Sequence, residues 1–299
     1  MNKQTKSKGR PFIKWVGGKR QLLERIEAAL STRITDCKSL TYIEPFVGGG
    51  AVLFHLLSTQ PNIKKAIIND INSDLITTYR TIRDNVDALT SFLFELQTQY
   101  RTLTTEETRK LFYLAKRERY NSKTLDAIEN SALFIFLNRT CFNGLHRVNS
   151  KGLFNVPFGK YQNPMICDEE TLRADSKLLQ YVEILNGDFA QTLPYASADT
   201  LYYLDPPYKP LSATSSFNSY AKNSFDDAEQ IRLKKFCDAI NARGATWILS
   251  NSDVRSNDPQ NDFFDNLYGS YQIERVWAMR SVNANPKKRG QLTELLIRS

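Results

Sequence analysis

Short apolar runs alternate with amphipathic helical patterns along much of the chain, and this alternation predicts an α/β fold. Strands are expected at 40–44, 66–70, 182–185, 201–204, 245–250, 272–278 and 293–297. Helical spacing of apolar residues is clearest at 22–30, 51–57 and 228–241. Strands that alternate with helices are typical of a doubly wound, Rossmann-like parallel sheet. We expect the first and last thirds of the chain to form one such domain.

The middle of the chain has a different pattern. Helical periodicity runs from about residue 74 to residue 139, with apolar stripes that include Leu89, Leu93 and Leu133. A helical block of this length is too long for a single crossover helix between two strands. We therefore predict that residues 1–73 and 182–299 form the sheet domain and that residues 74–181 form an inserted, mainly helical subdomain.

The charges are unevenly distributed. Lys and Arg outnumber Asp and Glu by 40 to 32, which gives a net charge of +8. Residues 1–20 contain seven Lys or Arg and no acid, and residues 130–167 contain no acid at all. Two basic segments without acids favour a polyanionic partner such as nucleic acid.

Other compositional features narrow the class of protein. No apolar run approaches the length of a membrane span, and the N-terminus lacks an apolar signal core, so we expect a cytoplasmic protein without membrane contact. The four Cys are scattered without a CxxC pair, and the chain has only two His. Neither a metal site nor a disulfide framework is expected.

The strand 201–204 ends at Asp205-Pro206-Pro207-Tyr208. Ligands bind outside the carboxyl ends of strands in such sheets, so Asp205 is expected at a binding site. The prolines stiffen the backbone and aim the Pro206 carbonyl. A carboxylate, a fixed carbonyl and the Tyr208 ring suit a planar group with an NH2, such as adenine or an amide. Taken alone, the motif fits a solvent-facing Asp before a Pro-Pro turn equally well.

A second motif predicts a nucleoside site. The strand 40–44 leads into a turn with Phe46, Gly48 and Gly50, and glycines there allow a ligand to approach the backbone closely. Asp70 ends the next strand, twenty residues after Gly50, in a position to bind ribose hydroxyls. The turn is not GxGxxG and is not followed by a Walker lysine, so S-adenosylmethionine is favoured over NAD or ATP.

Two further positions are candidates for binding the cofactor or an anion. Asp188 and Phe189 follow the strand 182–185, where they could hydrogen-bond to and stack on a cofactor adenine. Lys19 stands beside two glycines before the helical pattern at 22–30, and a helix N-terminus suits a carboxylate or phosphate. A solvated Lys in a glycine turn is the simpler reading of Lys19.

Residues 139–167, here called the irregular segment, lose helical periodicity. Aromatic, Asn, Gly and basic residues alternate in it: Arg139, Phe142, Asn143, Arg147, Asn155 and Lys160. Arg and Asn side chains can read base edges, Phe can wedge into a base stack, and Lys can contact phosphates. Alternatively the segment is a packed loop, and we expect at least two of Phe142, Phe154 and Phe158 to belong to the core.

Together these motifs resemble the Dam-type DNA adenine-N6 methyltransferases of the alpha group. The matching stretches are 14–19 (KWVGGK), 44–50 (EPFVGGG), 69–72 (NDIN), 143–145 (NGL) through 160–161 (KY), and 205–212 (DPPYKPLS). They follow the family's order of glycine motif, recognition insertion and DPPY, and they span nearly the whole chain. The resemblance implies S-adenosylmethionine as cofactor, double-stranded DNA as substrate and GATC as target. It also implies a nucleoid-associated location and a cognate restriction endonuclease as a further candidate partner.

The resemblance also assigns residues to roles. It implies that the S-adenosylmethionine site is lined by Trp15, Lys19, Asp70, Asp188 and Asp205. Lys14 and Arg147 would read guanines, Phe142 would be the wedge, and Asn143, Leu145, Pro157 and Tyr161 would make further DNA contacts. The chain departs from the family in one respect, because Phe142 stands where Tyr is common; the stacking face is retained and the hydroxyl is lost.

The expected chemistry is direct methyl transfer to a flipped adenine. The N6 lone pair is delocalised into the ring, so Asp205 and the Pro206 carbonyl would activate it by accepting both N6 hydrogens, while Tyr208 stacks on the base. Either Asp205 or water takes the leaving proton. The alternatives are an RNA adenine or protein-amide methyltransferase and a catalytically silent DNA-binding module. The amide class usually has Asn at the position of Asp205.

Overall fold

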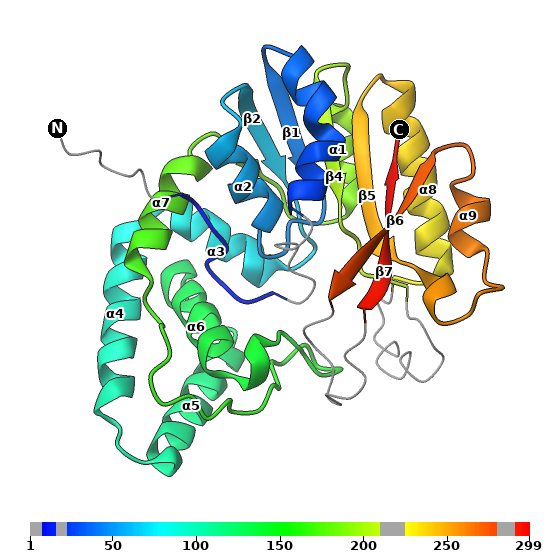
Figure 1. Ribbon diagram of the computed structural model, residues 1–299. Helices are drawn as coiled ribbons and strands as arrows, with labels where there is room; N and C mark the ends of the chain where they lie inside the picture. The colour runs from blue at the N-terminus through cyan, green and yellow to red at the C-terminus, as the bar shows by residue number, and fades with distance from the viewer. Residues whose placement is uncertain (1–7, 16–22, 210–224, 280–290) are drawn as a thin grey trace. The chain divides into compact units, whose positions relative to one another are not determined.

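The computed structural model describes residues 8–15, 23–209, 225–279 and 291–299 (Figure 1). Its sheet has seven strands in the order β3-β2-β1-β4-β5-β7-β6. They are β1 (Leu40–Glu44), β2 (Ile63–Ile68), β3 (Val182–Ile184), β4 (Thr200–Leu204), β5 (Thr246–Ser252), β6 (Gln272–Met279) and β7 (Gln291–Arg298). The predicted α/β fold is confirmed. The sheet is mixed rather than wholly parallel, because β7 runs antiparallel to both β5 and β6.

The helices are α1 (Leu23–Asp36), α2 (Ala51–Thr59), α3 (Ser73–Asp84), α4 (Val86–Thr102), α5 (Glu106–Asn121), α6 (Ala127–Thr140), α7 (Glu169–Leu179), α8 (Asp227–Ala242) and α9 (Phe263–Leu267). All but α7 and α9 lie where the apolar spacing predicts them. Short 3-10 turns are η1 (Phe142–Gly144), η2 (Phe189–Tyr195) and η4 (Val254–Ser256). The helical block expected from residue 74 is the run α3–α6. None of the helices in the described ranges has the length and apolar character that a membrane span requires.

Contacts between Cα atoms divide the chain into two compact units. The first unit contains Met1–Lys19, Gly48–Pro61 and Asp70–Gly187, and the second contains Arg20–Val47, Asn62–Asn69 and Asp188–Ser299. The helices α2–α7 belong to the first unit. The strands β1, β2 and β4–β7 belong to the second. The two units have other bounds than the domains expected from the sequence, residues 1–73 with 182–299 and residues 74–181, and those domains remain a prediction.

In the second unit the strand that leads to Asp205 is fully buried, and the strand that ends at Glu44 is buried except at Thr41. All five residues of β4 are buried, as a strand covered on both faces requires. The Tyr203 hydroxyl lies 2.8 Å from the Ser250 hydroxyl on β5, and the Tyr42 hydroxyl donates to Glu44 over 2.9 Å. These buried polar groups are therefore satisfied within the sheet.

In the first unit α6 is buried on nearly every side and packs against α3, α4 and α5. Buried tyrosines on α4 and α5 hold the neighbouring backbone: Tyr100 donates to the Tyr161 carbonyl (2.6 Å) and Tyr113 to the Val156 carbonyl (2.7 Å). Burial raises the pKa of Tyr100 to about 12. Both tyrosines thus remain hydrogen-bond donors at neutral pH.

Tyr120 on α5 instead donates to a carboxylate, Asp74, over 2.6 Å. Burial alone would raise the pKa of Asp74, but hydrogen bonds from Tyr120, Lys123 and Asn130 lower it below the ordinary value. We expect Tyr120→Phe to reduce the free energy of unfolding by about 1–3 kcal/mol at pH 7, because it removes a hydrogen bond to a charged group.

The folded-state pKa of Asp74 is depressed, so its contribution is present above its unfolded-state pKa and is lost as the pH falls from about 4 through the lower folded value. The stability difference between the unaltered protein and Tyr120→Phe should therefore shrink in that range. Chemical denaturation at a series of pH values measures it. Tyr113→Phe is the control, since its partner is a carbonyl that does not titrate; a parallel pH dependence in both variants would contradict the role of Asp74.

Candidate functional site

The segment Asp205–Tyr208 follows β4 directly, in the second unit, and its backbone is held from two sides. Gln230 on α8 donates to the Pro207 carbonyl (3.3 Å), and the Ser252 hydroxyl donates to the Lys209 carbonyl (2.7 Å). Asp205 is half-buried and Pro206 is buried. The neighbouring elements therefore fix the backbone around the carboxylate, as the two prolines predict.

Tyr208 is held through its hydroxyl, which donates to Glu294 on β7 over 2.9 Å. Burial raises the pKa of Tyr208 well above its usual value, and the carboxylates of Asp205 and Glu294 raise it further. The ring is thus neutral and anchored at its polar end. Sequence reasoning did not identify Glu294, which lies 86 residues away along the chain.

Three carboxylates act on this part of the second unit. After burial, the charges of Asp205, Glu44 and Glu294 each raise the pKa of the Tyr203 hydroxyl. Glu44 is itself only 2% exposed. Carboxylates are thus gathered around Tyr203, although the chain carries a net charge of +8. These side chains therefore fit a ligand with positive charge or N–H donors, such as a sulfonium group or an amino group, and disfavour a phosphate.

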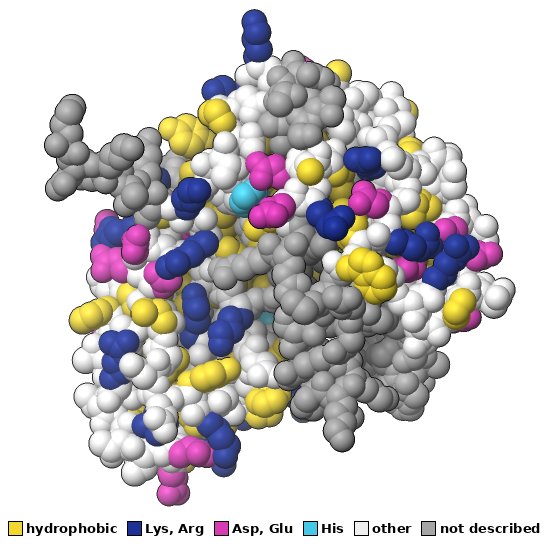
Figure 2. Space-filling view, viewed as in Figure 1, with side chains coloured by type: hydrophobic (Ala, Val, Ile, Leu, Met, Phe, Trp, Pro, Cys, Tyr) yellow, Lys and Arg dark blue, Asp and Glu magenta, His cyan; other side chains and the backbone are white. Residues whose placement is uncertain are grey.

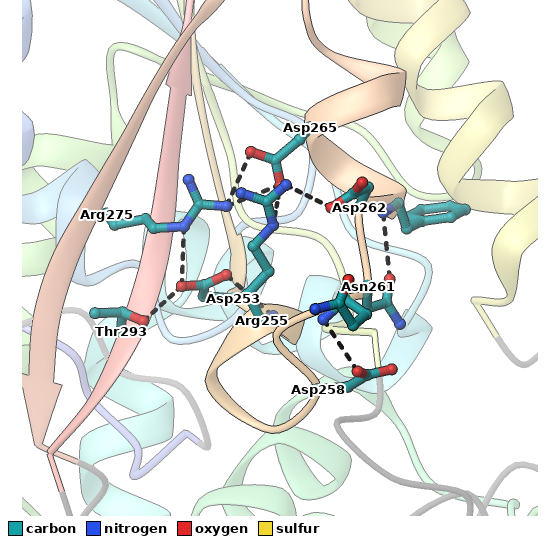
Figure 3. Close-up of polar contacts among 10 residues, drawn as sticks. Asp253, Arg255, Asp258, Asn261, Asp262, Asp265, Arg275 and Thr293 are labelled. Atoms are coloured by element: carbon teal, nitrogen blue, oxygen red, sulfur yellow. Dashed lines mark hydrogen bonds and ion pairs between the residues drawn. The ribbon is translucent and has the colours of Figure 1, made fainter.

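An ion-pair network braces the strand ends next to this segment (Figure 3). Asp253, directly after β5 and 3% exposed, accepts from Arg275 on β6 (3.2 Å) and from the Thr293 hydroxyl on β7 (2.6 Å). Arg275 also pairs with Asp265 on α9 (2.8 Å). The network joins β5, β6, β7 and α9, and thereby fixes Ser252 and Glu294, which are neighbours of Asp253 and Thr293 in sequence.

An aromatic cluster forms another part of the second unit. The Phe46 ring lies 5.3 Å from Phe189 and 5.8 Å from Phe225, between ring centroids. Arg232 covers Phe189 at 4.0 Å and binds both oxygens of Asp188, at 2.9 and 2.6 Å. The hydrogen bonds from Arg232 hold the pKa of Asp188 below its usual value. Asp188 and Phe189 are thus ordered by Arg232, a residue that the sequence pattern did not indicate.

The first unit contains the turn Gly48–Gly50, here called the glycine turn. Gly48 and Gly50 have φ of 47° and 71°, in the left-handed region that favours glycine. A Cβ on Gly48 would lie 2.7 Å from the Trp15 indole nitrogen, and one on Gly50 would lie 2.4 Å from the Tyr79 hydroxyl. The sequence suggested that a ligand requires these glycines. The structure adds a second reason, which is close packing of Trp15 and Tyr79.

Asp70 ties the glycine turn to the start of α3. One carboxylate oxygen accepts from the Gly48 amide (3.0 Å) and the other from the Asn72 amide (2.9 Å). Burial raises the pKa of Asp70, and these backbone hydrogen bonds oppose the shift. The first role of Asp70 in this structure is to shape the turn, and its binding to ribose remains a prediction. Lys19, the other predicted cofactor contact before the helical pattern at 22–30, lies outside the described residues.

All ten residues predicted to contact DNA belong to the first unit. The exposed ones are Lys14, Phe142, Asn143, Arg147, Pro157 and Lys160; the half-buried ones are Arg139, Leu145, Asn155 and Tyr161. Figure 2 shows Lys and Arg side chains on the face of this unit that carries α4 to α6. A protein surface of this kind can approach a polyanion.

The irregular segment folds back on itself. Bridges pair Cys141 with Phe158 and Val148 with Phe154, and Arg147 donates to the Asn155 side chain over 2.7 Å. Phe154 is buried at 4% exposure and Phe158 packs 5.5 Å from Tyr113, whereas Phe142 is 52% exposed. Of the three Phe, only Phe154 is fully buried in the core; Phe158 is half-buried against Tyr113, and Phe142 protrudes beside Asn143, whose φ is 55°.

Two basic residues of the irregular segment already have partners in the protein. Arg139 donates to the Phe12 carbonyl over 2.7 Å, so its guanidinium braces the N-terminal segment instead of pointing wholly to solvent. Lys160 pairs with Glu106 at 2.8 Å on the surface. Residue type alone suggested DNA contact for both, and it could not reveal these partners. Among the residues that the structure describes, no group of His, Cys, Asp or Glu is placed to hold a metal ion.

Comparison with known proteins assigns the chain to a family. Residues 15–282 match the family described as D12 class N6 adenine-specific DNA methyltransferase. The type II methyltransferase M.MjaIII of Methanocaldococcus jannaschii is 48% identical, over 96% of this chain and 98% of the relative. The type II methyltransferase M1.LlaDCHI of Lactococcus lactis subsp. cremoris and the DNA adenine methylase of Haemophilus influenzae are each 36% identical. Those two matches cover 96% and 97% of this chain, and 94% of each relative.

These matches decide the question that the Asp-Pro-Pro-Tyr motif left open between an adenine and an amide substrate. They also agree with the chemistry of the two units, one with an exposed basic face and one with carboxylates around a held tyrosine. The chain is an adenine-N6 DNA methyltransferase that uses S-adenosylmethionine, and it belongs to the D12 class.

Proposed function

We propose that the protein methylates the adenine of GATC in double-stranded DNA, and that this adenine leaves the helix to react. The observation that carries the target proposal is the exposure of Lys14 and Arg147, the two residues at guanine-reading positions of the family motif, on the same unit. Lys and Arg are the side chains that most often read guanine in the major groove. Base flipping gives the carboxylate access to N6.

In the proposed reaction the protein prepares N6 and holds the base. The Asp205 carboxylate and the Pro206 carbonyl accept the two N6 hydrogens, which turns the nitrogen lone pair out of the ring. The Tyr208 ring, anchored by Glu294, stacks on the adenine. S-adenosylmethionine, when bound, supplies a methyl group on positively charged sulfur. N6 would attack in line, forming the N–CH3 bond as the S–CH3 bond breaks and leaves its electron pair on sulfur, and would give its proton to Asp205 or to water, with no covalent enzyme intermediate.

The cofactor roles are proposed unit by unit. In the second unit Asp188, ordered by Arg232, accepts a hydrogen bond from the adenine moiety, and Phe46 and Phe189 supply aromatic faces. In the first unit we propose that the glycine turn, Trp15 and Asp70 contact the cofactor. The packing of Trp15 on the turn supports this, since it places the indole against Gly48, in the turn that leads directly into the N-terminus of α2.

The proposed DNA contacts follow exposure and chemistry. Phe142 protrudes and has an aromatic face, which supports the wedge role without the hydroxyl of Tyr. The proposed base contacts, besides Lys14 and Arg147, are Asn143, Leu145, Asn155, Pro157 and Tyr161. Arg139 is proposed to act on DNA only indirectly, through the segment it braces, and Lys160 to contact phosphate.

A cognate restriction endonuclease that cuts the same site is the proposed functional partner. Two of the relatives named above are type II methyltransferases, and this supports a paired enzyme. Direct contact between the two enzymes is not part of the proposal. Methylated target DNA that resists such an endonuclease would be the functional link.

A methyl-transfer assay tests the proposed target. Labelled S-adenosylmethionine is incubated with duplexes that contain GATC or a scrambled site, and the product is challenged with endonucleases that do not cut methylated GATC. We expect the GATC duplex alone to take up labelled methyl groups and to become resistant to these endonucleases. Equal label in the scrambled duplex, or label without protection, would refute the GATC assignment.

The role of Asp205 generates the first functional prediction. Asp205→Ala should abolish methyl transfer and leave duplex affinity within a small factor, because phosphate and guanine contacts lie elsewhere. Asp205→Asn tests the same point with side-chain shape retained, and a loss of kcat is expected, since its neutral amide oxygen is a weaker acceptor than the carboxylate. Single-turnover rates and DNA binding by fluorescence anisotropy measure the two effects. Turnover near that of the unaltered protein would exclude the proposed mechanism.

The base-reading role of Arg147 generates the second functional prediction. Arg147→Ala should cost about 1–3 kcal/mol in kcat/KM on the target and relax discrimination at one base pair. The assay compares GATC with duplexes substituted at each position. Asn155→Ala is the matched variant, because it removes the side-chain acceptor that holds Arg147 and should produce a weaker form of the same change. Equal loss on every duplex would mean that Arg147 contacts only phosphate.

A third prediction concerns Lys160. Lys160→Ala should weaken binding to all duplexes alike and lower the dependence of log affinity on log salt by roughly one. The ion pair with Glu106 is exposed and contributes little to stability, so folding should be unaffected. Glu106→Gln is the counterpart, because it removes the carboxylate that competes with phosphate and should strengthen binding. Anisotropy titrations at several salt concentrations would detect an unchanged slope, which would contradict a phosphate contact.

A further inference from the structure

Asn138, near the end of α6, is a buried amide that none of the motifs predicts to be functional. It is 3% exposed. Its carbonyl oxygen accepts from the Lys14 amide (2.8 Å), and its nitrogen donates to the Lys14 carbonyl (2.8 Å) and the Gly144 carbonyl (2.9 Å). An Asn side chain has two N–H donors, and both are used here. One side chain thus binds two segments that are far apart in the sequence.

The contact with Lys14 has the form of strand pairing. Asn138 binds both the N–H and the C=O of one residue, which fixes the position and the direction of the Lys14 backbone. The neighbouring Arg139 binds the Phe12 carbonyl over 2.7 Å and anchors the same segment two residues earlier. Side chains in the last turn of α6 therefore provide the backbone hydrogen bonds that a neighbouring strand would otherwise provide to the segment that carries Lys14.

The Lys14 side chain is also guided by its surroundings. Gly144 has a φ of 65°, and a Cβ there would lie 2.6 Å from the Lys14 Cβ and Cδ atoms, so the aliphatic stem lies against the Gly144 backbone. The Lys14 ammonium lies 4.7 Å from the centroid of the Tyr161 ring. Asn138 holds the carbonyl of Gly144 and thereby the surface on which this stem rests.

We propose that Asn138 is a positioning residue for base recognition. It acts through Lys14, by holding the Lys14 backbone and the Gly144 carbonyl, beside which the Lys14 stem rests. It therefore sets discrimination at the base pair that Lys14 reads. Arg147 is held by Asn155 instead, so discrimination at its base pair does not depend on Asn138. The inference rests on the base-reading role proposed above for Lys14.

The test measures specificity at each base pair rather than activity alone. The unaltered protein is first given a library of duplexes, and the sequence that it methylates is taken as the target, whether or not it is GATC. The ratio of kcat/KM for the target to that for each singly substituted duplex is then compared in Asn138→Ala. The ratio should fall about tenfold at one base pair, the equivalent of about 1.4 kcal/mol, and stay unchanged at the base pair that Arg147→Ala affects.

Ser131→Ala is the matched control on the same helix. Ser131 is fully buried and bonds to Thr81 (2.9 Å) and to the Ala127 carbonyl (2.7 Å), away from Lys14. It should lower thermal stability and leave every specificity ratio unchanged. If Asn138→Ala does not fold, Asn138→Ser provides a milder loss of the same hydrogen bonds. A matching loss of specificity in Ser131→Ala would make the effect one of general stability and would overturn the proposal.

A double-mutant cycle with Lys14→Met separates the inference from its premise. If Asn138 acts through Lys14, then Asn138→Ala should change specificity by less than about twofold in the Lys14→Met background. If Lys14→Met alone retains full specificity, the role proposed for Lys14 is wrong. If Lys14→Met loses specificity while Asn138→Ala and Asn138→Ser keep it, Lys14 reads the base and the inference about Asn138 is wrong.

Discussion

Backbone groups outside helices and strands still need hydrogen-bond partners, and this requirement governs the first unit. The irregular segment and the residues around Lys14 form no long ladder, so side chains of buried helices bind their backbone. Asn138 binds Lys14 and Gly144, and Tyr100 and Tyr113 bind carbonyls of residues 161 and 156. Exposed side chains of the irregular segment can then differ in chemistry without moving its backbone, because side chains of the buried helices hold that backbone in place.

The second unit gathers carboxylates around a buried tyrosine, because Asp205, Glu44 and Glu294 all raise the pKa of Tyr203. Two arginines of the same unit bind other carboxylates: Arg275 binds Asp253 and Asp265, and Arg232 binds Asp188. A basic protein thus carries clustered carboxylates in one unit and exposed Lys and Arg side chains in the other. These carboxylates and these basic side chains lie in different parts of the chain. The net charge of +8 is a sum over the whole chain and does not describe either part.

The sequence predicted features that depend on local pattern. Most strands and helices and the turns at Gly48–Gly50 and after Asp205 follow from periodicity, glycine and proline, whereas the protruding Phe142 followed only from the family resemblance. Residues that act across long separations were missed, because Glu294, Asn138 and Gln230 are ordinary polar residues in regular elements. Arg139 was assigned to DNA by its type, whereas its partner at Phe12 lies 127 residues away. The glycines were found correctly, but the packing of Trp15 and Tyr79 on them requires coordinates.

The place of β7 in the sheet has a consequence for synthesis of the protein. β7 pairs with both β5 and β6, and it contains Glu294, the partner of Tyr208. During translation the Asp-Pro-Pro-Tyr segment therefore emerges long before the residue that anchors its ring. A nascent or truncated chain that lacks β7 would expose the open edges of β5 and β6, which can pair with other chains. The anchor of the Tyr208 ring and the cover of these two strand edges are thus acquired together, when β7 is made.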